Sequence, residues 1–254
     1  MELEKLIQRY EVQSEYKEFI NEFVEMVKNE FREKVHSIYI CGSIAKGTAK
    51  PNKSDADFTI IVSDKIIKSY YSKINDIRSE LLNKYKCIPR IDITLCTVKD
   101  ILDSCDWGFW IKIISYCIYG NDLGEQVQPV IPTVNLVLEL NKDTLSIIDS
   151  NIDKLDNAAD SSTVSLLRNR LVKRSMRALF SLVLMEHVKW EDKIFDMKEI
   201  VKEYMPEESE LVESLYGFYE LDIENQIEFS FTIHKIKTLI EKKLGELLET
   251  LKKS

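Results

Sequence analysis

The sequence predicts an α+β protein, with an N-terminal mixed sheet flanked by helices and a C-terminal all-α helical bundle. Two observations carry this prediction. Apolar runs typical of strands occur only before Thr133, whereas the patterns after it have the three-and-four spacing of amphipathic helices. A turn-rich stretch with two glycines and two prolines, residues 120–132, separates the two regions. We therefore expect two domains, residues 1–125 and residues 126–254.

Length and composition are those of an ordinary globular protein. The 254 residues suffice for two domains with a core each, and 44% of them are hydrophobic and 31% charged. No apolar run approaches the roughly 18–20 residues of a membrane span, and the charged start of the chain lacks the apolar segment of a signal peptide. The five cysteines are an odd number without a C-x-x-C pair, which favours a reducing compartment. We expect a cytoplasmic protein without membrane contact.

The first elements alternate between helix and strand. Residues 15–33 carry apolar side chains at helical spacing, and Ser14 is the expected N-cap. The apolar run at residues 38–41 predicts a short strand, and residues 55–62 return to strand chemistry after a polar stretch. Residues 65–86 then predict a connecting helix whose apolar stripe belongs to the core.

The next segments hold one carboxylate and a group of aromatic side chains that could serve a site. A strand follows Pro89, and its alternation places Asp92 on the face opposite the apolar side chains. A carboxylate within an otherwise apolar strand is costly unless it is paired or metal-bound, or unless that face is exposed. Residues 105–124 bring several aromatic side chains and then a turn. Trp107 and Trp110 either line a substrate cleft or cement an interface between two domains.

The C-terminal half reads as five amphipathic helices that form a bundle. The expected helices are Val134–Leu155, Val164–Val188, Glu191–Tyr204, Glu208–Tyr219 and Gln226–Leu251.

Two carboxylates near the start of the second strand indicate a site. Side chains alternate along a strand, so Asp55 and Asp57 project the same way from one edge of the sheet. Adjacent carboxylates repel each other unless a positive charge lies between them, and hard oxygen ligands of this kind suit Mg²⁺. The turn at Gly42-Ser43, just upstream, would offer backbone amides to a phosphate. The combination indicates nucleotide chemistry.

Gly42-Ser43 followed by Asp55-Ala56-Asp57 after a strand resembles the signature of the DNA polymerase β-like nucleotidyltransferase superfamily. Asp92 matches the third acidic residue that this superfamily carries on a later strand. In length and layout the chain is similar to the aminoglycoside adenylyltransferases. These join a catalytic nucleotidyltransferase domain, here residues 1–125, to a helical substrate-binding domain, here residues 126–254.

The resemblance implies roles for the motif residues. Gly42 and Ser43 would bind phosphates, and Asp55 and Asp57 would bind one or two Mg²⁺ ions, with ATP or another nucleoside triphosphate as co-substrate. Asp92 would be a third metal ligand or a general base; the aminoglycoside enzymes generally use a Glu as the base, which leaves its role open. Lys46, one turn beyond Ser43, would neutralise the β- and γ-phosphates or would lie on the surface.

The net charge of −8 bears on the acceptor. The chain has no long basic stripe for a nucleic acid, which argues against a nucleic-acid partner. An acidic enzyme suits a cationic substrate, although acidity also serves solubility alone. The exception is a local basic cluster in which Arg170, Arg174 and Arg177 share one helix face. This face would contact the triphosphate or would be solvated.

Together these features predict a Mg²⁺-dependent nucleotidyltransferase that moves a nucleoside monophosphate, AMP from ATP, to a hydroxyl of a small cationic acceptor such as an aminoglycoside-type antibiotic. Two alternatives remain. One is transfer to a protein or a tRNA, as in toxin–antitoxin nucleotidyltransferases, and the other is a non-catalytic nucleotide-binding sensor. The protein would act as a monomer or a homodimer.

Overall fold

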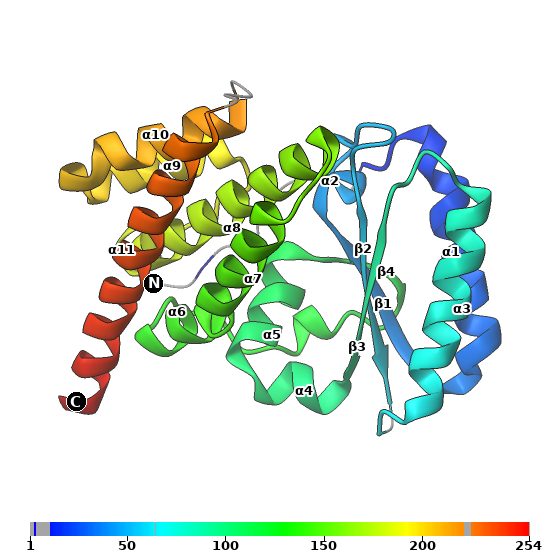
Figure 1. Cartoon of the computed structure of the whole chain (residues 1–254). Helices are drawn as coiled ribbons and strands as arrows, with labels where there is room; N and C mark the ends of the chain where they lie inside the picture. Colours follow the sequence, from blue (N-terminus) through cyan, green and yellow to red (C-terminus); the bar gives the residue numbers. More distant parts are fainter. Residues whose placement is uncertain (1–2, 4–10, 64, 221–224, 254) are drawn as a thin grey trace. The chain divides into compact units, whose positions relative to one another are not determined.

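The computed structural model describes residues 3, 11–63, 65–220 and 225–253 (Figure 1). The described residues divide into two compact units, residues 11–130 and residues 131–253, and Leu3 belongs with the second. One unit contains the sheet and the other contains only helices, which confirms the predicted α+β fold class. The assignment of separate functions to residues 1–125 and 126–254 stays a prediction.

The sheet of the first unit has four strands in the order β3-β2-β1-β4. They are β1 (Val35–Cys41), β2 (Ala56–Val62), β3 (Ile91–Thr97) and β4 (Tyr116–Gly120). β1 pairs antiparallel with both β2 and β4, whereas β2 and β3 run parallel, so the sheet is mixed as predicted. The sequence pattern did not reveal β4, because its aromatic side chains and its glycine resembled a cluster followed by a turn.

Helices α1 (Ser14–Phe31) and α3 (Lys68–Lys84) cover one face of this sheet (Figure 1). Their apolar stripes pack with alternate side chains of β1 and β2 in the larger core, where Phe23 and Phe58 stack with ring centroids 3.7 Å apart. Gln13, and not Ser14, is the N-cap of α1, and its side chain makes no capping hydrogen bond. The prediction for Ser14 was wrong because this serine is already the first helical residue.

The opposite face carries a smaller core. It is built by α4 (Val98–Asp103), α5 (Cys105–Phe109), the π-helical turn Trp110–Ile114 and the 3₁₀ turn Leu123–Glu125.

Tyr39 on β1 fastens the segment after β4 to this face. Its hydroxyl donates to Asp122 Oδ1 at 2.8 Å and accepts the Leu123 N–H at 2.6 Å. Burial, followed by the hydrogen bond to Asp122, raises the pKa of Tyr39 well above its ordinary value.

The helical unit is arranged around the long helix α8 (Ser161–His187), against which all its other α-helices pack. These are α6 (Val134–Asn141), α7 (Thr144–Asp156), α9 (Ile194–Tyr204), α10 (Ser209–Glu220) and α11 (Gln226–Lys253), with a short 3₁₀ turn at Pro206–Glu208. None of the described helices is long and apolar enough to span a membrane.

The first helix expected in this unit, Val134–Leu155, is in fact two helices. Asn141 ends α6 with a buried side chain whose Nδ2 donates to Val137 O at 2.8 Å and to Ser181 Oγ at 2.6 Å. Its Oδ1 accepts the Thr144 hydroxyl at 3.2 Å, at the start of α7. Asparagine favours turns over helix interiors because its side chain competes for local hydrogen bonds.

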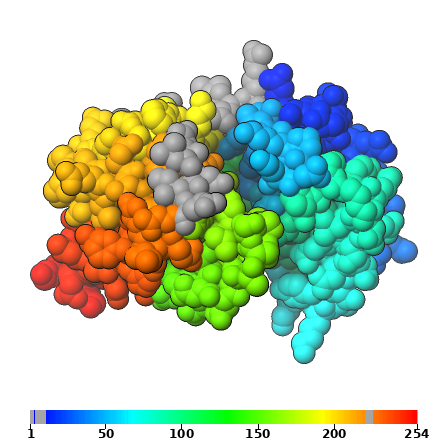
Figure 2. Space-filling view, turned by 45° about the horizontal axis from the view of Figure 1, so that its top comes forward, coloured from blue at the N-terminus to red at the C-terminus, as the bar shows by residue number. Residues whose placement is uncertain are grey.

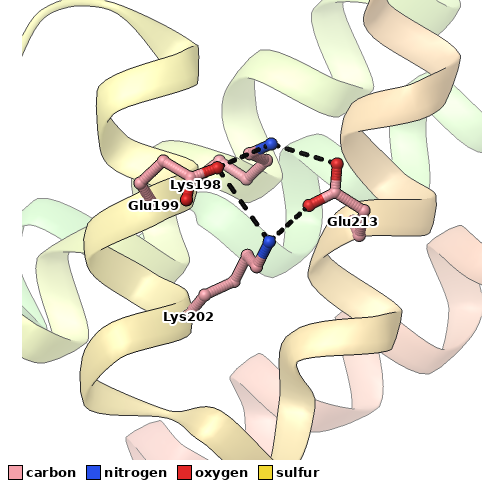
Figure 3. Close-up of polar contacts among 4 residues, drawn as sticks. All are labelled: Lys198, Glu199, Lys202 and Glu213. Atoms are coloured by element: carbon pink, nitrogen blue, oxygen red, sulfur yellow. Dashed lines mark hydrogen bonds and ion pairs between the residues drawn. The ribbon is translucent and has the colours of Figure 1, made fainter.

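Helices α9 and α10 are linked by a small ionic network around Lys198 (Figure 3). The Nζ of Lys198 is 2.7 Å from Glu199 Oε1 and 3.0 Å from Glu213 Oε1, and Lys202 reaches Glu213 Oε2 at 2.7 Å. Burial lowers the pKa of Lys198, but its hydrogen bonds with Glu199 and Glu213 outweigh burial and hold that pKa above its ordinary value. We regard this network as structural.

Candidate active site

The turn that leaves β1 is shaped by Gly42. Its φ of +77° lies in the left-handed region, and a Cβ added there would be 3.0 Å from Asp57 Oδ2. Only glycine therefore fits here without strain or a close contact with the carboxylate. The following helix α2 (Gly42–Ala45) is one turn long, and the Ser43 carbonyl accepts the Thr48 N–H at 3.0 Å. The turn thus places Gly42 beside the carboxylate of Asp57.

Asp57 and Asp92 are direct neighbours across the parallel pair β2 and β3. Side chains at paired positions leave a sheet on the same face. Ala56 and Phe58, which flank Asp57, pack into the core under α1 and α3, so both carboxylates lie on the opposite face. Cys41 pairs with Asp57 from the other side. The register of β2 and β3 therefore places Asp57 and Asp92 side by side on one face.

This face changes character along the strands. Beyond Asp57 and Asp92 it becomes apolar, where Ile61 and Cys96, paired in register, join the smaller core. Burial, with smaller effects of nearby carboxylates, raises the pKa of the Cys96 thiol to about 12. The polar end of this face therefore lies beside Cys41, where β1 ends and the turn at Gly42 begins.

Arg90 is a functional candidate that the sequence reasoning missed. Its Nη2 lies 2.6 Å from Asp55 Oδ2 and 2.9 Å from Asp92 Oδ2. The repulsion between neighbouring carboxylates predicts a metal ion between them, whereas in this structure a guanidinium lies between two of the three. A signal was present, because Arg90 precedes Asp92 by two residues and so shares its face by alternation.

The three carboxylates have the donor chemistry that Mg²⁺ requires, since carboxylate oxygens are its ordinary protein ligands. Among the residues that the structure describes, however, no group of three or more His, Cys, Asp or Glu side chains is arranged to hold a metal ion. The residue types therefore fit Mg²⁺. For Asp55 Oδ2 and Asp92 Oδ2 to bind the same ion, the Arg90 guanidinium would have to move from between them.

The loop from Lys46 to Asp55 connects α2 to β2 and lies at the edge of the candidate site. Lys46 is partly buried, whereas residues 50–53 are exposed, and this stretch of the chain appears at the surface in light blue in Figure 2. Asn52 anchors the loop by donating its backbone N–H to the Cys87 carbonyl at 2.7 Å. A role for Lys46 at a phosphate stays a prediction.

The two tryptophans occupy different surroundings in the first unit. Trp107 on α5 packs against the smaller core. Trp110 begins the π-helical turn, is partly buried and contacts Phe109 edge to face, with ring centroids 5.6 Å apart. Their proposed role in a substrate cleft is not decided by these contacts.

Arg170, Arg174 and Arg177 all lie on α8 in the helical unit. Arg177 is exposed, whereas Arg174 is partly buried and its Nε has no hydrogen-bond partner within the described part of the chain. Burial, followed by the nearby charge of Arg177, lowers the pKa of Arg174. Their role as phosphate contacts stays a prediction.

Comparison with known proteins identifies the first unit. Residues 17–106, which include Gly42, the three aspartates and Arg90, match the family model described as a nucleotidyltransferase domain. Residues 17–106 are a nucleotidyltransferase domain. The predictions of a polymerase β-like nucleotidyltransferase and of an enzyme of this class are thereby confirmed.

The fold of this nucleotidyltransferase is similar to that of a solved structure, the spectinomycin adenyltransferase AAD(9) from Enterococcus faecialis, determined with ATP and spectinomycin. The match has a TM-score of 0.54 at 18% sequence identity and covers 88% of this chain and 98% of the other. No curated protein sequence gives a significant match. At this identity the likeness establishes a common fold.

Proposed function

We propose that this nucleotidyltransferase transfers AMP from ATP to a hydroxyl of a small cationic molecule, of the aminoglycoside type, and releases pyrophosphate with the aid of Mg²⁺. The observation that carries the proposal is the pairing of Asp57 and Asp92 on one sheet face, beside the turn at Gly42. The fold shared with an adenyltransferase that binds ATP and spectinomycin supports this choice of nucleotide and acceptor. The net charge of −8 agrees with a cationic acceptor.

In this proposal each motif residue has one task. Asp55, Asp57 and Asp92 hold the metal, and Ser43 and the amides after Gly42 bind the β- and γ-phosphates. Bound Mg²⁺ supplies positive charge that stabilises the transferring phosphoryl group and lowers the pKa of the attacking hydroxyl. Residues 126–254 hold the acceptor. Lys46 and the three arginines of α8 are the further candidates for contacts with the phosphates.

The proposed setting is the cytoplasm. None of the five cysteines forms a disulfide, which supports a reducing compartment for this chain.

The test is metal-dependent release of pyrophosphate from ATP across a panel of aminoglycosides, spectinomycin, lincosamides and other hydroxylated amines. We expect release that requires one acceptor class and disappears in the D55N/D57N double variant. D76N serves as a matched control, because Asp76 is an exposed aspartate on α3 in the same unit. Turnover retained in D55N/D57N would refute the assignment of these aspartates.

Absence of pyrophosphate release with every compound of the panel would refute the small-molecule acceptor. If ATP still bound, a macromolecular acceptor or a sensor function would take its place.

A further inference from the structure

Arg90 binds two of the three candidate metal ligands through a single nitrogen. The Nη2 atom contacts both Asp55 Oδ2 and Asp92 Oδ2, at 2.6 and 2.9 Å. This differs from the two-nitrogen fork with which arginine usually holds one carboxylate. The Nε of Arg90 is buried and has no hydrogen-bond partner within the described residues. The guanidinium is thus tied at one end only, to the two carboxylates.

The surroundings allow this interaction to be exchanged. The side chains of Arg90, Asp55 and Asp92 have exposed fractions of 40, 27 and 49%, so none of the three is sealed from water. The strand does not need the side chain for its position, because the Arg90 carbonyl already accepts the Ala56 N–H at 3.0 Å. Partly exposed ion pairs contribute little to stability and can break at low cost.

A guanidinium nitrogen and a metal ion compete for the same place. Mg²⁺ requires oxygen ligands at about 2.0–2.1 Å, shorter than either contact of Arg90, so Asp55 Oδ2 and Asp92 Oδ2 cannot share a metal while Nη2 lies between them. On the proposed function, we infer that Arg90 is an internal counter-ion that holds Asp55 and Asp92 in the nucleotide-free protein and leaves them when they bind the metal. It therefore weakens metal binding by the free enzyme.

A positioning role for Arg90 would change the metal affinity in the opposite direction from a competing role. If Arg90 only positioned the two carboxylates for the metal, its removal would loosen them and weaken metal binding. If it competes with the metal, its removal leaves Asp55 and Asp92 without this counter-ion and strengthens metal binding. The direction of one affinity change therefore decides between the two roles.

The experiment measures Mn²⁺ binding without nucleotide, by the electron paramagnetic resonance signal of free Mn²⁺ at low ionic strength. We expect R90Q to bind Mn²⁺ at least about tenfold more tightly than the wild type, which corresponds to about 1.4 kcal/mol. R90K keeps the charge and should stay within about threefold of the wild type. If R90Q does not fold, as judged by circular dichroism, R90M takes its place.

R78Q is the matched control. Arg78 also reaches β3, but it donates to neutral oxygens, the Ile91 carbonyl at 3.0 Å and Asn75 Oδ1 at 2.8 Å. Its loss removes an equal charge from the same unit and should leave Mn²⁺ binding unchanged. A second control, D55N/R90Q, should lose the gained affinity, because the gain is assigned to these carboxylates.

Affinity of R90Q equal to or below that of the wild type would overturn the inference, as would a gain that persists in D55N/R90Q. Because the readout involves no turnover, the inference and the proposed function can fail separately. A tighter Mn²⁺ site in R90Q, with no acceptor ever adenylylated by the wild type, would uphold the first and refute the second. Unchanged Mn²⁺ binding with intact adenylyl transfer would do the reverse.

Discussion

Substitution of Gly42 by alanine tests the shape of the turn at the candidate site. The residue has φ of +77°, and the new methyl group would lie 3.0 Å from Asp57 Oδ2. An L-residue in the left-handed region loses roughly 1–2 kcal/mol relative to glycine. The contact is with the end of the Asp57 side chain, so the carboxylate can move away from the new methyl group by a few tenths of an ångström. This movement displaces the carboxylate from its place in the candidate site.

The structure therefore predicts two effects of G42A. The free energy of unfolding should fall by about 1–2 kcal/mol, which for a chain of this size lowers the melting temperature by roughly 2–4 °C. The rate of pyrophosphate release should fall at least about tenfold, because Asp57 is a proposed metal ligand and small displacements at a reacting centre have large effects on rate. Thermal melting followed by circular dichroism and the coupled pyrophosphate assay measure the two effects.

G245A is the same chemical change in a different setting. Gly245 lies within α11, and a Cβ built there meets no heavy atom within 4 Å. Alanine should stabilise the helix by about 0.5–1 kcal/mol and leave activity unchanged. An unchanged melting temperature of G42A would refute the strain at this turn. Full activity of a destabilised G42A would refute the importance of the position of Asp57.

Two further predictions concern stability. Y39F removes the acceptor of the buried Leu123 N–H, so the unfolding free energy in urea should fall by about 1–2 kcal/mol, and an unchanged midpoint would contradict that bond. E213Q removes a partner of Lys198, and hydrogen bonds from Lys202 and Lys198 hold the pKa of Glu213 below its ordinary 4.5. A carboxylate whose pKa is lowered on folding stabilises the folded state at every pH above its pKa in the unfolded chain. E213Q should therefore lower the melting temperature at neutral pH. The difference between E213Q and the wild type should vanish as the pH falls through the lowered pKa of Glu213. A difference that persists at pH 2–3 would show that packing, not charge, is responsible.

Local patterns in the sequence were sufficient for much of the fold. The amphipathic stripes of α1 and α3 appear in the spacing of their apolar residues, because a helix can bury only one side against a sheet. Alternation along the strands likewise assigned Asp92 to the face opposite the apolar side chains and gave Asp55 and Asp57 a common direction, since the period of a strand is fixed by its geometry. The motif from Gly42 to Asp57 was enough to identify the nucleotidyltransferase.

Other features depended on partners distant in the sequence. β4 (Tyr116–Gly120) is a strand because β1 offers it an edge, and the break after Asn141 is fixed by hydrogen bonds that include Ser181. The parallel register brings Asp92 beside Asp57, and only this pairing makes two separate strand residues one site. The position of Arg90 between Asp55 and Asp92 was decided in the same way. Composition and spacing determine which side chains can carry charge to a face, whereas the pairing of strands determines which charges meet there.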